Sequence, residues 1–87
     1  MNQPLLVADP YGALTTTIQS LGPSAMGTSE ATLGFAVVGE LLERLPMSTS
    51  EFALAWQHLT NAVAYHAKAE FGACRFELRM CVASVPT

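Results

Sequence analysis

Two residues in the C-terminal half, His66 and Glu70, have side-chain types and a spacing that could support chemistry. Side chains four residues apart share one face of a helix, so this pair could hold a divalent metal ion or act as acid and base. Cys74 and Glu77 follow at helical spacings along the same edge of this helix. No second histidine joins it, because His58 would lie about two turns away and roughly 80° around the helix. An intrahelical hydrogen bond at the border of a buried face is the simpler interpretation.

We therefore predict no catalytic residue, metal site or cofactor. A small metal-binding or enzymatic domain that uses His66 and Glu70 is kept as the alternative function. The sequence contains no Cys-x-x-Cys pair, no Gly-x-Ser-x-Gly motif and no glycine-rich phosphate-binding loop.

The two cysteines, Cys74 and Cys81, stand seven residues apart. On a helix this spacing separates them by about 10.5 Å, at 1.5 Å per residue, whereas a disulfide spans Cα atoms at most roughly 7 Å apart. In a strand they would point to opposite faces, so an intrachain disulfide is excluded in either structure. We expect two buried, small apolar residues. An intermolecular disulfide or a reactive thiol is the alternative.

A line of cations follows the same segment. In a helix, Lys68, Arg75 and Arg79 would all face solvent, either as ordinary solvated residues or as a docking strip for an acidic partner. Several apolar side chains, Leu54 among them, lie outside the main apolar sector of that helix, and a helix that is apolar on more than one side is usually covered on more than one side. The predicted partner-binding residues are Tyr65, Lys68, Arg75, Phe76, Arg79 and Met80.

Composition limits the classes of protein that the chain can belong to. Its 87 residues suffice for a single small domain. The hydrophobic share of 51% is high and the charged share of 13% is low, which excludes a wholly disordered chain and indicates that another chain covers some apolar surface. With four basic and seven acidic residues and a net charge of −3, the chain lacks the cation cluster that nucleic-acid binding requires.

Location and source are predicted only broadly. No apolar run approaches the roughly 20 residues that span a bilayer, and the first ten residues lack the basic start and apolar core of a signal peptide. We therefore expect no membrane span and a cytoplasmic location. One lysine against three arginines and a single isoleucine are typical of a GC-rich genome, which suggests a bacterial or phage source.

The elements that would position these residues are helices. Residues 1–8 are expected to be a flexible or docking arm, and Asp9-Pro10 has the residue types of a helix start. Apolar residues at spacings of three and four predict a first helix over residues 10–21, which Gly22-Pro23 ends. A second helix is predicted over residues 29–45, capped by Thr28 or Ser29. Gly34 and Gly39 are expected on its more polar side, where another backbone could approach.

The remaining segment, from about residue 50 to residue 82, allows two interpretations. Ser48 and Glu51 match a capping box, and a continuous apolar sector that includes Trp56 as a core residue favours one continuous or kinked helix. Alternation over residues 74–82 instead predicts a helix to Phe71 followed by a strand at about 74–83. The fold predicted is mainly α, a three-helix or helical-hairpin domain, with α+β as the alternative.

The predicted function follows from the apolar surface. We expect a small non-enzymatic interaction module, such as an adaptor, chaperone or inhibitor, that acts through an apolar helical surface as an oligomer. Its partner would be another protein, a second copy of itself, or both.

Overall fold

The computed structural model describes residues 9–86, and the predicted arm at residues 1–8 lies outside them. Within this range the chain forms helices α2 (Pro10–Ser20), α3 (Ser29–Arg44), α4 (Thr49–Ala67) and α5 (Phe71–Ala83), and no strand. The mainly α prediction is confirmed. The number of helices differs, since four are present where three were predicted.

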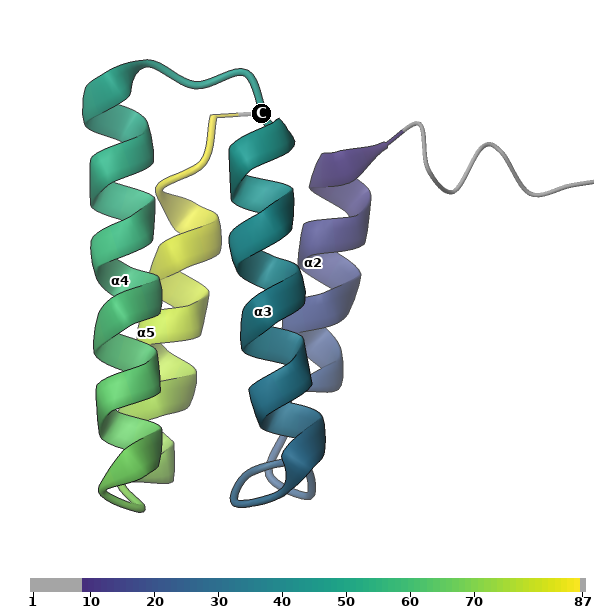
Figure 1. Ribbon diagram of the computed structural model, residues 1–87, viewed down its shortest axis with the longest axis vertical. Coiled ribbons are helices and arrows are strands. Elements are labelled where there is room, and N and C mark those ends of the chain that lie inside the picture. The colour runs from purple at the N-terminus through teal and green to yellow at the C-terminus, as the bar shows by residue number, and fades with distance from the viewer. Residues whose placement is uncertain (1–8, 87) are drawn as a thin grey trace, which may run out of the picture.

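The helices form an antiparallel bundle in which each runs opposite to its neighbour along the chain (Figure 1). Helices α3 and α4 make the front layer of Figure 1, with α2 behind α3 and α5 behind α4. The contacts α2–α3, α3–α4, α4–α5 and α2–α5 close the bundle into a ring of four. Buried side chains from all four helices meet in one hydrophobic cluster.

The predicted caps are present at the first three helix starts. The Asp9 side chain accepts a hydrogen bond from the Gly12 amide at 3.1 Å, and Thr28 caps α3 through the amide of Glu30. At the start of α4, Ser48 and Glu51 form both hydrogen bonds of a capping box. Each cap satisfies amides that the first helical turn leaves without a partner.

The prediction of one continuous or kinked helix from about residue 50 to residue 82 is wrong, because two helices separated by a turn occupy this segment, and the alternative strand at 74–83 is wrong as well. The chain reverses over residues 68–70, and α5 returns antiparallel to α4. The reversal is a Schellman turn, in which the Glu70 amide donates to the Tyr65 carbonyl at 2.9 Å and the Ala69 amide donates to the His66 carbonyl at 3.0 Å. Ala69 has φ 60°, a left-handed conformation that usually falls to glycine.

Small buried side chains pack where α4 and α5 meet the core. Ala55 and Ala62 of α4 are fully buried, as are Cys74 and Cys81 of α5, so the expectation that the cysteines are small buried residues is confirmed. Both thiols are free. Burial raises the pKa of Cys81 to about 11, and burial also raises the pKa of Cys74, against an opposing effect of nearby Arg75.

The two glycines of α3 are buried beneath neighbouring side chains, which corrects their predicted place on the more polar side of the helix. A Cβ atom on Gly34 would stand 2.6 Å from Cδ2 of Leu21, and one on Gly39 would stand 3.3 Å from the ring of Trp56. Both glycines are buried. What approaches α3 at these points is therefore a large side chain of another segment, and each glycine makes room for it.

Candidate functional site

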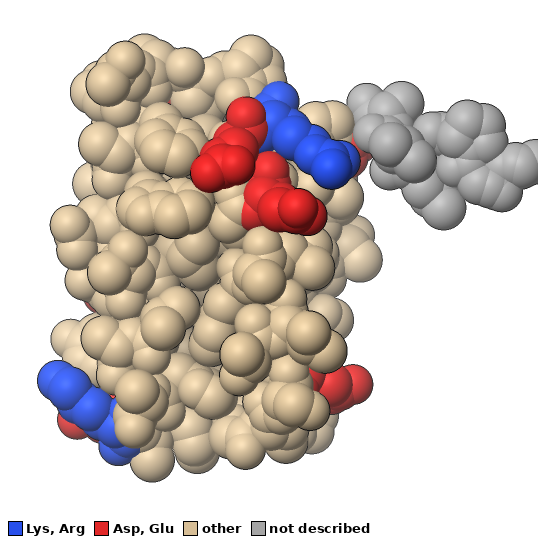
Figure 2. Space-filling model, in the orientation of Figure 1, with Lys and Arg blue, Asp and Glu red and all other residues tan. Residues whose placement is uncertain are grey.

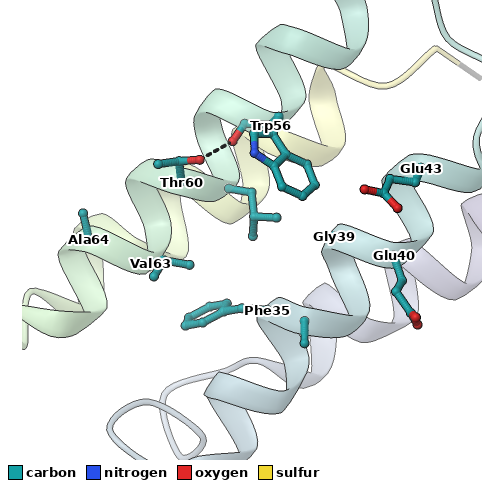
Figure 3. Close-up of a pocket in the computed structure, with 10 residues that line it drawn as sticks. Phe35, Gly39, Glu40, Glu43, Trp56, Thr60, Val63 and Ala64 are labelled. Carbon is teal, nitrogen blue, oxygen red and sulfur yellow. Dashed lines mark hydrogen bonds between the residues drawn. The ribbon is translucent and has the colours of Figure 1, made fainter.

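An apolar groove with a cavity volume of about 640 Å³ lies between α3 and α4. Figure 3 shows the ring of Phe35 on α3 and the side chains of Trp56 and Val63 on α4 directed toward the space between the helices. The lining residues are Phe35, Ala36, Gly39, Glu40, Glu43, Trp56, Leu59, Thr60, Val63 and Ala64. We refer to this set as the α3/α4 groove.

Aromatic rings lie on both walls of the groove. The Trp56 ring stands over Gly39 and stacks on Phe52, with ring centroids 5.5 Å apart. The Phe35 ring contacts His66 edge-on, with centroids 5.2 Å apart. Leu59 is buried and also lines the groove. On α4 it lies between Trp56 and His66, the two residues of this helix that make these ring contacts.

Trp56 is not the core residue that its place in the apolar sector predicted. Its side chain is 38% exposed, and Val63 on the same wall is 43% exposed. The apolar sector of α4 is wider than the strip that α3 and α5 cover, so its edge remains in contact with solvent. A Trp ring left on the surface in a hollow is typical of binding sites, where Trp is enriched among the residues that contribute most.

Charge is confined to one part of the groove. Glu40 and Glu43, from α3, are its charged lining residues, and Arg44 follows them in the chain. Figure 2 shows the same face of the molecule, with the charged side chains gathered toward its ends and a broad uncharged area between them. Among residues 9–86, the one contact within salt-bridge distance joins His58 to Glu77, so neither groove carboxylate has a basic partner at that distance.

The structure does not bring His66 and Glu70 together as a pair. Nε2 of His66 accepts a hydrogen bond of 2.9 Å from the Gly27 amide, and its ring lies against Phe35 and Phe71. Glu70 is exposed in the turn before α5. His66 therefore ties the α2–α3 linker to the end of α4. Gly27, the linker residue that it contacts, has φ +80°.

A polar network that the sequence analysis missed joins α4 to α5. Nδ1 of His58 lies 2.7 Å from Oε1 of Glu77, and Asn61 Nδ2 donates to the same oxygen at 3.3 Å. The three residues come from two helices, so spacing along one helix could not have indicated the cluster. Over residues 9–86 there is no group of three or more His, Cys, Asp or Glu side chains placed to bind a metal ion.

The predicted partner-binding residues fall into two groups, because the chain reverses between them. Lys68 lies over the Tyr65 ring at the end of α4, with Nζ 5.9 Å from the ring centroid. The others belong to α5, where Phe76 is 50% exposed and the Arg79 guanidinium lies 5.9 Å from its ring centroid. Arg75 and Arg79 also line a small hollow of about 160 Å³ between α2 and α5, while Met80 is half-buried.

No helix in the described part of the chain is long and apolar enough to cross a membrane. Comparison with known proteins finds no protein family, no curated protein and no solved structure that matches this chain.

Proposed function

We propose that this protein is a small non-enzymatic interaction module, an adaptor, chaperone or inhibitor, that acts as an oligomer through the α3/α4 groove. We further propose that it works in a bacterial cytoplasm. The observation that supports the binding role is the groove itself, a hollow of about 640 Å³ whose walls are mainly apolar.

The lining chemistry favours a protein partner over a small polar substrate. Sites for small molecules combine an apolar wall with a few polar groups that converge on the ligand. In this groove Thr60 already donates its hydroxyl to the Trp56 carbonyl at 2.9 Å, and the charged groups are two carboxylates from one helix. An open groove between two helices, with apolar walls and a charged rim, is instead the form that accepts an amphipathic helix.

The energetics point in the same direction. Removing apolar surface from water contributes about 25 cal/mol per Å², and aromatic side chains bury roughly 150–250 Å² each when fully covered. Trp56 and Val63 keep 38% and 43% of their surface exposed. A partner that covered them would remove this apolar surface from water and so gain free energy on binding.

The metal-binding alternative has less support. His66 would have to exchange the Gly27 amide for a metal ion at Nε2, and that exchange would release the α2–α3 linker from the end of α4. Purified protein that gains thermal stability from added divalent ions, and loses this gain in His66→Ala, would support the alternative.

The proposal is tested by the molar mass of the protein in solution, from size-exclusion chromatography with light scattering. We expect the wild type to exceed the mass of one chain and Val63→Asp to be monomeric, since a carboxylate in the groove would be buried by the partner at high cost. Val37→Asp is the matched control, because Val37 is 42% exposed on α3 and is not a lining residue. It should assemble like the wild type. A wild type that stays monomeric at all concentrations would contradict the proposal.

Trp56 offers a second readout, since it is the single tryptophan of the chain. It lines the groove, so its fluorescence reports directly whether the groove is covered. We expect a blue-shifted emission at high protein concentration and a red shift on dilution. Val63→Asp should emit at the red-shifted position at every concentration.

A further inference from the structure

The shape of the groove limits what can occupy it. A hollow between two helices is filled by a convex surface, and close packing is what makes an interface stable. Two copies that met groove to groove would enclose two hollows and leave apolar walls without contact. The occupant must therefore present a ridge with a large apolar side chain at its crest.

This chain carries such a ridge on α5. Phe76 is 50% exposed and has the largest side chain among the exposed apolar residues of the described range that lie outside the groove. The Arg79 guanidinium lies over its ring, and Arg75 precedes it by one residue. Helix α5 belongs to the back layer of the bundle, whereas the groove opens between the two helices of the front layer (Figure 1).

Charge matches between these two surfaces. Glu40 and Glu43 stand on one wall of the groove, and neither has a basic group within salt-bridge distance among residues 9–86, although Arg44 follows them on α3. Arg75 and Arg79 flank the ridge and likewise have no carboxylate partner in that range. An arginine beside an aromatic crest would meet a carboxylate beside an apolar hollow, and complementary charge fixes both the register and the orientation of an interface.

We infer that the occupant of the α3/α4 groove is a second copy of this chain, docked through its α5 ridge, with Phe76 in the groove and Arg79 facing Glu40 and Glu43. This inference rests on the proposed function and names its partner. The two surfaces differ and lie in different layers, so the contact is head-to-tail. Such a contact produces rings if the rotation closes and open chains if it does not.

A mixing experiment tests this pairing directly. Val63→Asp blocks the groove and leaves the ridge intact, while Phe76→Asp removes the ridge and leaves the groove intact. We expect each variant alone to be monomeric, and an equimolar mixture to form a 1:1 dimer that grows no further, because one intact groove meets one intact ridge. Circular dichroism of each variant should match the wild type, since both positions are on the surface.

A charge exchange provides a second test with milder changes. Arg79→Glu should raise the concentration at which half of the protein is assembled by at least tenfold, because it places a carboxylate opposite Glu40 and Glu43. Adding Glu43→Arg to the same chain should restore assembly to within about threefold of the wild type. Both residues are exposed, so folding should be unaffected. Glu43→Arg that gives no recovery would overturn the proposed register.

The outcomes separate the two proposals. If the wild type assembles and Val63→Asp does not, while Phe76→Asp still assembles or the mixture yields no dimer, the α5 ridge is not the occupant and the groove function stands. The groove is then occupied by another surface of this chain. If the wild type is monomeric throughout, both the self-association and the pairing are overturned.

Discussion

Helix α4 contacts one neighbour closely and leaves the other partly open. It packs more extensively against α5 than against α3. On the α5 side, the His58–Glu77–Asn61 network crosses the interface, beside small core residues of both helices such as Ala62 and Cys74. On the α3 side, the Trp56 ring stands over Gly39 and a groove remains along the contact.

The size of the side chains accounts for this difference. Interaxial distances between packed helices depend on the residues at the contact, so alanines and cysteines allow close approach, whereas rings hold the helices further apart. The α4–α5 interface therefore contributes mainly to the stability of the subunit. The α3–α4 interface retains uncovered apolar surface, which is the property that a binding surface requires.

Shortening a buried residue of α5 should have the largest effect on the free energy of unfolding among the changes that test this comparison. Leu78 is 1% exposed, so Leu78→Ala leaves a cavity and should lower the free energy of unfolding by about 3 kcal/mol. Val63→Ala in the groove should change it by less than about 0.5 kcal/mol. Urea denaturation followed by circular dichroism measures both. Equal losses for the two variants would mean that the groove is part of the core after all.

The buried thiols of α5 make the stability depend on alkaline pH. Burial raises the pKa of Cys81 from 9.0 to about 11 in the folded chain, so the unfolded chain loses this proton first as the pH rises. The stabilising contribution is complete below pH 9 and should be lost between pH 9 and 11, a decrease on the order of 2 kcal/mol. Urea titrations with a reductant present would show it.

Cys81→Ala is the control for this pH dependence. The variant should start from a lower stability at pH 8 and show a shallower decline toward pH 11, with the raised pKa of Cys74 still contributing part of the slope. Identical slopes in the variant and the wild type would show that other groups control the alkaline transition.

Removing the carboxylate of the polar network should have a smaller effect. Glu77→Ala leaves His58 Nδ1 and Asn61 Nδ2 without the acceptor they share, and partly buried donors without a partner cost about 1–2 kcal/mol. A double-mutant cycle with His58→Ala should give a coupling of about 1 kcal/mol. A coupling near zero would assign no stabilising role to this contact.

The sequence was most informative where structure depends on neighbouring residues. The caps at Asp9, Thr28 and Ser48 follow from local hydrogen bonds between residues two or three positions apart, and the apolar periodicity predicted the helical class. The reversal of the chain between α4 and α5 was not predictable in the same way. Apolar sectors before and after the turn at Ala69 both face one core, so periodicity continues across the reversal.

Features built from distant segments required the structure. Gly34 and Gly39 gave no local signal of the side chains that press on them. The α3/α4 groove depends on which strip of α4 is covered by its neighbours, and the sector that includes Trp56 is equally apolar whether covered or not. Phe76 was predicted as a surface apolar residue because it lies off the main sector, and its 50% exposure agrees with this.

The turn at residues 68–70, between α4 and α5, is where the smallest and most local effect on stability is expected. Ala69 has φ 60°, which costs an L-residue roughly 1–2 kcal/mol, while glycine adopts this conformation freely and loses part of the gain through its more flexible unfolded chain. Ala69→Gly should therefore raise the free energy of unfolding by about 0.5–1 kcal/mol. Ala53→Gly, at an exposed position inside α4, should instead lower it by about 1 kcal/mol. Changes of opposite sign in the free energy of unfolding would show that the turn between α4 and α5 closes at some conformational cost. A decrease for both substitutions would place Ala69 in an ordinary helical conformation.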